Sequence, residues 1–262
     1  MLARDEAGQR RGARYKQTRE QRTVFGRTRR AEQQFARQLR GIAKQCGLLA
    51  QHYDPDRPET AHWLIGALRK YSAGVENWAQ ATSLRMLEDV AERDEQAWAR
   101  HSANMSEALR REVRQAPTGE LMRALLAEQV GLITSIPREA AARVQELAVR
   151  VMEAGERSGS LVEEIFRTGE VAESRAKLIA RTEVARSSSK LTEARARYIG
   201  SDGYIWRSAE DRDVRPLHRR LNGRYFRWDD PPVAGSSGER AHAGQIYNCR
   251  CVPEPVVPEY VA

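Results

Sequence analysis

Apolar residues recur at every third or fourth position through most of the chain, which is the spacing of an amphipathic helix. In residues 31–51 this stripe consists of Phe35, Leu39, Ile42, Cys46 and Leu49. The turn "DPDRP" at residues 54–58 ends that helix, because proline removes a backbone donor and restricts the residue before it. The next stripe consists of Leu64, Leu68, Tyr71, Val75 and Trp78. We predict a second helix from about residue 58, continuing with breaks towards residue 114.

Residues 118–200 continue the helical pattern. The apolar run "LLAEQVGLITSI" is expected to end at Pro137, which would then occupy the first turn of a new helix lasting to about Gly155. "SLVEEIF" at residues 160–166 predicts a short helix, and residues 173–200 predict a long one that Gly200 terminates.

The pattern changes at Ser201. "GYIWRS", "GRYFRW" and "CRCVPEPVV" are short aromatic or β-branched segments between turns rich in Asp, Gly and Pro, as expected of strands. Gly223 in "NGRY" predicts a turn with positive φ, while Trp206 and Trp228 are expected to form the core of this part. To be stable, a module this small usually has to dock onto helices, bind a metal ion or contain a covalent cross-link.

We therefore predict an α+β fold that is mostly α, with an extended helical N-terminal region and a helical body. Four consecutive segments follow: a basic arm at 1–45, a helical hairpin or stalk at 46–130, the helical body at 131–200, and a small β-containing C-terminal module at 201–262.

Positive charge is concentrated at the start of the chain. The whole protein carries +8, whereas residues 1–45 hold thirteen Lys and Arg against four Asp and Glu, a net charge of +9. Such a cluster could neutralise phosphates without reading sequence, or it could be a solvated tail that touches acidic protein surface or nothing. The residues proposed to contact DNA or an acidic surface are Arg10, Arg11, Arg14, Lys16, Arg19, Arg22, Arg27, Arg29 and Arg30.

Membrane insertion and disulfide chemistry are not expected. No run of about 18 apolar residues is present, and the first residues lack the apolar core of a secretory signal, so we expect a protein that begins in a cytoplasm. Three cysteines cannot form an even disulfide framework, and a bridge between Cys249 and Cys251 would be strained.

Candidate chemistry lies in the C-terminal module. Asp211, Asp213, Arg215 and His218 occupy a turn and a short helix, where Arg215 could fork onto a carboxylate and His218 could face the cysteines. His218, Cys249, Cys251 and His242 are the candidate ligands of a structural zinc ion, which would close a loop of about thirty residues.

Two other interpretations of this cluster remain open. In the first, both cysteines pack as small hydrophobes on one face of the last strand, and Asp211 or Asp213 holds His218. In the second, three ligands and a water make an open catalytic metal site.

The sequence lacks Gly-x-Ser-x-Gly, a phosphate-binding glycine loop and His-Glu-x2-His, so we expect neither an enzyme nor a small-molecule substrate. A redox role is disfavoured because Cys-x2-Cys is absent.

Four segments in a fixed order resemble a known family. "GLITSIPREAAARVQELAVRVMEAGERSGSLVEEI", "LIARTEVARSSSKLTEAR", "GYIWRSAEDRDVRPLHRRLNGRYFRWDDPP" and "HAGQIYNCRC", within residues 131–257, resemble the phage head morphogenesis domain of Mu F-like minor head proteins. Within them, "RTE" at 181–183 could form an ion pair with the C-terminal module or be a solvated helix face.

The resemblance implies a structural minor head protein of a phage-type particle, present in few copies and acting in head assembly and DNA packaging or delivery. Its implied partners are portal and major capsid proteins and packaged double-stranded DNA, in the host cytoplasm during assembly and then in the virion head. Family members sometimes carry toxin-like extensions, and we expect none here because eleven residues follow Cys251. The competing interpretation is a free DNA-binding or metal-dependent DNA-processing protein.

Overall fold

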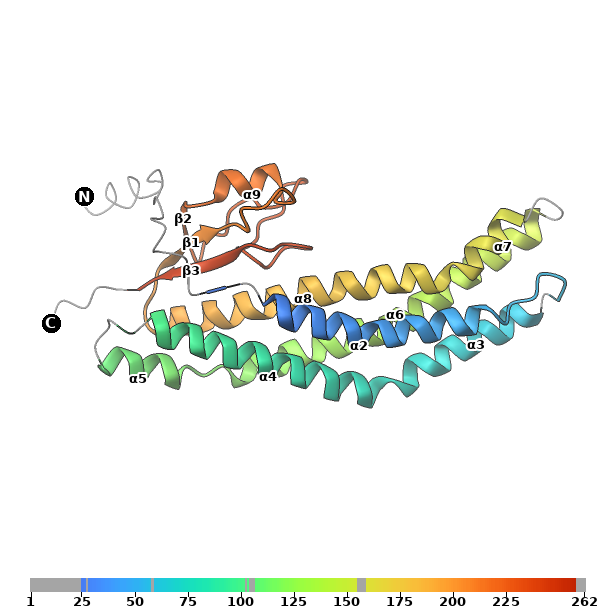
Figure 1. The fold of residues 1–262 in the computed structure, drawn as a ribbon, viewed down its shortest axis with the longest axis horizontal. Helices are drawn as coiled ribbons and strands as arrows, with labels where there is room; N and C mark the ends of the chain where they lie inside the picture. Colours follow the sequence, from blue (N-terminus) through green and yellow to red (C-terminus); the bar gives the residue numbers. More distant parts are fainter. Residues whose placement is uncertain are drawn as a thin grey trace. The chain divides into compact units, whose positions relative to one another are not determined.

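The computed structural model describes residues 25–257, except residues 27, 58, 102, 104–106 and 155–158. The proposed contact residues of the arm from Arg10 to Arg22, and Arg27, therefore lie outside the described residues, whereas Arg29 and Arg30 are exposed at the start of a helix. The described part contains eight helices and one three-stranded antiparallel sheet (Figure 1). The prediction of an α+β, mostly α fold is confirmed.

The chain forms two compact units, each built from non-consecutive segments. We call residues Arg30–Met86 and Ala124–Arg181 the helical unit. The described residues up to Arg29, those within Leu87–Arg123 and those from Thr182 onwards form the sheet unit. The four segments expected from the sequence are consecutive, whereas these units interleave along the chain.

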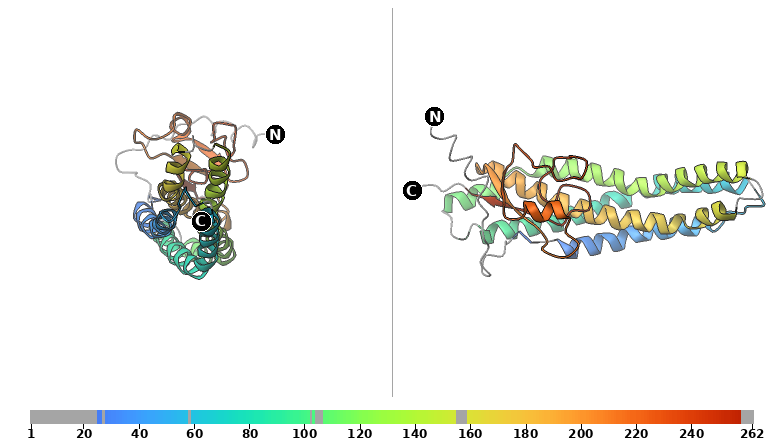
Figure 2. Two further views of the ribbon diagram at one scale, coloured as in Figure 1. Left: turned by 90° about the vertical axis from the view of Figure 1, so that its right-hand side faces the viewer. Right: turned by 90° about the horizontal axis from the view of Figure 1, so that it is seen from above.

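The helical unit contains α2 (Arg29–Ala50), α3 (Glu59–Gly74) and α7 (Gly159–Phe166), with parts of α4 (Glu76–His101), α6 (Gly119–Ala154) and α8 (Thr168–Tyr198) (Figure 2). Phe35, Leu39, Ile42 and Cys46 are all buried on α2, as their spacing predicts. In the second predicted stripe, Leu64 and Leu68 of α3 are buried, whereas the last residue, Trp78 of α4, is exposed.

Helix α6 continues through Pro137, so the predicted break at this residue is wrong. A proline inside a helix costs about 3 kcal/mol, through a lost hydrogen bond and a steric clash. Buried residues on both sides offset this cost, including Ile133, Ile136, Ala140, Ala141 and Val144. Ser72 of α3 donates to the carbonyl of Thr134 (2.7 Å), and Arg175 of α8 donates to Ser135 (2.8 Å), so neighbouring helices hold α6 next to the proline.

Helices α2 and α8 approach each other at a pair of glycines. A Cβ atom on Gly169 would lie 2.6 Å from the Cα of Gly47, and one on Gly47 would lie 3.2 Å from the Cα of Gly169. Because the obstructing atoms are backbone, a side chain here would have to separate the helices.

We expect Gly169→Ala to lower the free energy of unfolding by about 1–3 kcal/mol, the usual cost of overpacking. Gly41→Ala is the matched control, because nothing lies within 4 Å of its added Cβ in the same helical unit. It should be neutral or stabilising by up to about 1 kcal/mol through helix propensity. Urea unfolding of both variants measures the difference, and equal stabilities would contradict the close approach.

The sheet unit holds β1 (Gly203–Arg207), β2 (Tyr225–Arg227) and β3 (Val252–Val256), with α9 (Pro216–Leu221) and α5 (Glu107–Gln115). Strand β1 is central and pairs antiparallel with β2 and β3, in a register that sets Tyr204 opposite Phe226 and Trp206 opposite Pro253. Each strand lies in a segment where the sequence predicts one. Gly200 and Gly223 take positive φ angles of 78° and 74°, as expected at a helix end and a turn.

Aromatic side chains form the core of the sheet unit. Trp206 and Trp228 are buried together with Tyr204, and the rings of Tyr204 and Trp228 lie 4.5 Å apart. The indole nitrogen of Trp228 donates to the hydroxyl of Ser201 (3.2 Å). The prediction that both tryptophans serve the module's core agrees with their burial.

Within the described residues, none of the helices combines the length and the apolar character needed to cross a bilayer.

Candidate metal centre

Two short segments bring a histidine and two cysteines together in the sheet unit. Helix α9 starts at Pro216, whose fixed φ suits the first helical turn, and it buries His218 and Leu221. Asn248 has a positive φ of 53°, and the chain that follows carries Cys249 and Cys251 towards β3. The cysteines precede β3, which begins at Val252, so they do not lie on one face of the last strand as one interpretation expected.

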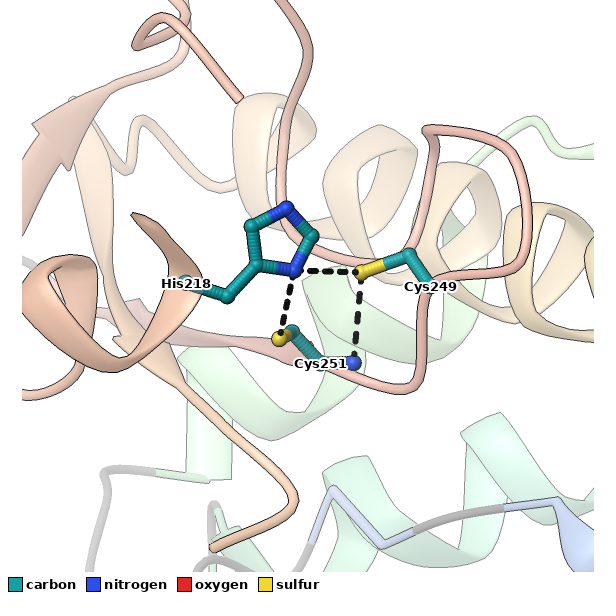
Figure 3. A group of neighbouring side chains, drawn as sticks. All are labelled: His218, Cys249 and Cys251. Carbon is teal, nitrogen blue, oxygen red and sulfur yellow. Dashed lines mark hydrogen bonds between the residues drawn. The ribbon is translucent and has the colours of Figure 1, made fainter. Parts of the chain in front are cut away.

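The three side chains converge on one point (Figure 3). Nδ1 of His218 lies 3.6 Å from Sγ of Cys249 and 3.5 Å from Sγ of Cys251, and the three atoms lie within 4.8 Å of one another. The backbone N–H of Cys251 donates to Sγ of Cys249 (3.4 Å). His218, Cys249 and Cys251 are only 3%, 1% and 2% exposed.

Hydrogen bonding orients the imidazole of His218. Nε2 lies 2.9 Å from the carbonyl oxygen of Ala234, which can only accept, so Nε2 carries a proton. In the neutral ring, Nδ1 therefore presents its lone pair to both sulfurs. The ring also meets Trp206 edge to face, with centroids 5.3 Å apart.

The two thiols titrate as a pair. The hydrogen bond with Cys251 lowers the pKa of Cys249. Burial raises this pKa, and the hydrogen bond with His218 lowers it further. The hydrogen bond between the two cysteines, together with burial, raises the pKa of Cys251. Burial alone would lower the pKa of His218, but its hydrogen bond to Cys249 and the charge there raise it overall.

His242 lies apart from this cluster. Its Nδ1 is 3.2 Å from the hydroxyl of Tyr204, and its Nε2 is 3.8 Å from a carboxylate oxygen of Glu193. Among the described residues, the group that could hold a metal ion contains only His218, Cys249 and Cys251.

The charged residues near His218 are paired differently from expectation. Arg250, not Arg215, forks onto a carboxylate, donating two hydrogen bonds of 2.7 Å to Asp211 and lying 3.6 Å from Asp213. Arg215 donates to the carbonyl of Tyr247 (3.0 Å). The expectation that Asp211 or Asp213 holds His218 is wrong, because the imidazole donates to Ala234. In the sequence, Arg250 stands between Cys249 and Cys251, and this position could have identified Arg250 as a residue of the site.

One face of α8 anchors the loop that precedes the cysteines. The hydroxyl of Thr182 accepts from the backbone N–H of Asn248 (3.1 Å), and Ser189 donates to the carbonyl of Ala243 (2.7 Å). Glu193 accepts from Gln245 (2.8 Å). Thr182, Ser189 and Glu193 are seven and four residues apart, which places them on the same side of a helix.

The "RTE" segment contacts the C-terminal module through its threonine. Arg181 instead pairs with Glu32 of α2 (3.0 Å), and Glu183 lies 3.7 Å from Arg186 one turn further along α8. The loop is also closely fitted against α8 at Gly244. This residue has φ of 85°, and a Cβ there would lie 2.9 Å from the carbonyl of Cys251 and 3.2 Å from the side chain of Ser189.

These features define a small α+β module in which a three-stranded sheet, α9 and a histidine–dicysteine cluster dock onto a long helix. Residues 142–254 match the family described as Phage Mu protein F like protein. The match runs from α6 to β3 and includes the cluster and the anchoring face of α8. Over these residues, the resemblance to Mu F-like proteins noted in the sequence is confirmed.

A similar protein is known in Haemophilus influenzae (strain ATCC 51907 / DSM 11121 / KW20 / Rd). That uncharacterized protein is 33% identical over 138 residues, which cover 53% of this chain and 30% of the relative. The match thus spans less than a third of the relative's length. The search of solved structures found no match.

Proposed function

We propose that the protein is a structural minor head protein of a phage-type particle, acting in head assembly and in DNA packaging or delivery near the portal. The single observation that carries this proposal is the Mu F-like match over residues 142–254. The proposed partners are portal and major capsid proteins and packaged double-stranded DNA. The proposed location is the host cytoplasm during assembly and then the virion head.

The packing of the C-terminal module supports a structural role. His218 and both cysteines are buried, and the carboxylate of Asp211 is engaged by Arg250. A free metal-dependent DNA-processing protein, the alternative, needs its reactive groups within reach of a bound strand. A pocket in the same module is lined by Ser208, Glu210, Asp211, Arg212, Arg219 and Asn222, and none of the three clustered residues lines it.

Exposed apolar side chains on the helical unit support protein partners. A multi-subunit shell would cover such residues, which cost free energy when they face water. The large apolar side chains exposed on this unit are Leu48, Trp63, Trp78, Leu84, Val149, Met152, Phe166 and Val171.

Particle fractionation tests the proposal. Heads assembled with the protein are separated from free protein by sedimentation, and the copies per particle are counted by quantitative mass spectrometry. We expect a low, fixed number of copies that survives a salt wash. Recovery only in the free fraction, with metal-dependent cleavage of DNA by that fraction, would reject a head component in favour of the alternative.

The basic arm gives a separate prediction about DNA. Because arginines here would act through charge alone, replacing Arg10, Arg11 and Arg14 with glutamine should weaken retention of double-stranded DNA and lower the salt slope by about 3. The matched control replaces the same residues with lysine, which keeps the charge and should keep retention. These substitutions leave α2, which starts at Arg29, intact. Unchanged retention by the glutamine variant would reject the assignment of this arm to DNA.

A further inference from the structure

We propose that His218, Cys249 and Cys251 bind one zinc ion, which stabilises the C-terminal module and takes no part in turnover. This inference does not depend on the proposed function, because it rests on the geometry and the chemistry of three side chains.

The two sulfur–nitrogen distances fit a tetrahedral ion. Zinc lies about 2.3 Å from a thiolate sulfur and about 2.0–2.1 Å from an imidazole nitrogen, which at the tetrahedral angle separates sulfur from nitrogen by about 3.5 Å. The observed separations are 3.6 Å and 3.5 Å. A thiol that is hydrogen-bonded to an imidazole lies at a similar distance, but Nδ1 has one lone pair and can accept from only one thiol, whereas both sulfurs lie at this distance from it.

The groups around the cluster orient its donor atoms as a metal site requires. Ligating histidines usually donate their second ring N–H to a carbonyl or carboxylate, which fixes the tautomer, and Nε2 of His218 does so to Ala234. The N–H of Cys251 donates to the sulfur of Cys249, a bond that strengthens when the sulfur is a thiolate. These hydrogen bonds therefore orient the ligand atoms of His218 and Cys249 before an ion binds.

Charge favours the bound state. Two thiolates, a neutral imidazole and a divalent ion sum to zero, so binding would leave no net charge among these buried groups. Without the ion, ionising either thiol would leave charge among side chains that are at most 3% exposed, which is costly. The softness of two sulfurs and one imidazole favours zinc over magnesium or calcium.

Burial and position favour a structural ion. The three described side chains supply three of the four ligands of a tetrahedral site. The fourth ligand would be a non-protein group, as in many catalytic sites, or a side chain from elsewhere in the chain. However, all three residues are shielded from solvent, and none of them lines the pocket at Ser208, Asp211 and Asn222. The ion would join α9 to the segment before β3 and so close the intervening chain, which spans 30 residues between His218 and Cys249.

Metal analysis of the full-length protein tests the proposal. We expect about one zinc ion per chain in the wild type, and a loss of most of it in Cys249→Ser, Cys251→Ser and His218→Gln. Cys46→Ala is the matched control, because it removes a buried thiol of α2 in the helical unit and should retain the zinc. Zinc content that is the same in all variants would identify an adventitious ion and overturn the assignment.

A second measurement covers the case in which the ligand variants do not fold. The reduced wild-type protein is stripped of metal and titrated with Co²⁺, which should produce a thiolate-to-cobalt charge-transfer band and tetrahedral d–d bands that saturate at one ion per chain. Zinc should displace the cobalt and raise Tm. The proposal fails if the wild type holds less than about a tenth of an ion per chain and shows no cobalt bands. A Cys249–Cys251 disulfide in the protein as purified would overturn it in favour of redox chemistry.

Failure of this site and failure of the head-protein proposal can be told apart. Particle association is measured without reference to metal, so a wild-type protein that enters heads but binds no zinc or cobalt would overturn only the metal assignment.

Discussion

Replacing Asp94 with alanine is expected to lower the free energy of unfolding by about 3–5 kcal/mol, because it leaves a buried charge without its partner. Asp94 of α4 lies 2.9 Å from Nε of Arg195 on α8, and it accepts a hydrogen bond from Thr192 (2.5 Å). The side chains of Asp94 and Arg195 are 1% and 7% exposed. In the alanine variant, the guanidinium would stay in the interior of the sheet unit with neither water nor carboxylate.

Asp94→Asn is the matched control, since it keeps the size and the hydrogen bond from Thr192 but removes the charge. We expect it to be destabilised like the alanine variant, but by less, because it leaves no cavity and its amide oxygen can still accept from Thr192. Urea unfolding with near-ultraviolet circular dichroism measures both. A loss below about 1 kcal/mol for Asp94→Ala, the range of an exposed ion pair, would show that the pair is solvated.

The same residue gives this prediction a pH dependence. Burial raises the pKa of Asp94 from 3.8 to about 6, even though Thr192 and Arg195 lower it. The folded protein therefore binds this proton more readily than the unfolded chain does. The resulting contribution to stability is fully present below about pH 3.8 and is lost as the pH rises through about 6. Relative to Asp94→Asn, the wild type should gain stability between pH 7 and 4, and a relative loss would contradict this sign.

Trp206→Ala is the second large expected effect, with a loss of about 3–5 kcal/mol in the free energy of unfolding. Trp206 lies on the central strand β1, is fully buried, and meets both His218 and Phe226 edge to face. Removing its ring would leave a cavity beside the clustered sulfurs and would also free the imidazole of His218 to move.

Trp63→Ala removes the same side chain at a position that is 52% exposed, so it serves as the control. We expect a change of well under 1 kcal/mol there, as for most surface substitutions. If zinc is bound as proposed, Trp206→Ala should also release the ion faster to a chelator, whereas Trp63→Ala should not. Equal losses of stability in the two variants would contradict the core role of Trp206.

The sequence was a good guide to local structure. The apolar spacing at Phe35, Leu39, Ile42 and Cys46 predicts the buried face of α2, because helical periodicity depends only on residues within a few turns. The three strands and the positive φ of Gly223 follow from equally local signals. The break expected at Pro137 fails because α3 and α8 hold α6 at Thr134 and Ser135, just before the proline. A rule that uses only neighbouring residues cannot detect such contacts.

The candidate site was only partly accessible to the sequence. His218, Cys249 and Cys251 were named as possible ligands from their residue types. Their separation by about thirty residues of sequence says nothing about distance, however, so His242 was an equally reasonable choice. The structure separates them, since His242 binds the hydroxyl of Tyr204 while Nδ1 of His218 faces both sulfurs.

By itself, the sequence predicted most of the helices, the three strands and the excess of positive charge in residues 1–45, and it indicated the family that residues 142–254 match. These features are carried by periodicity, turn residues, net charge and ordered motifs. Only the tertiary structure decided which donors converge, that Arg250 rather than Arg215 takes Asp211, and that Thr182, Ser189 and Glu193 anchor the loop before the cysteines. The physical reason is that side-chain partners far apart in sequence are selected by the packing of whole helices and strands, in which each contact depends on all the others.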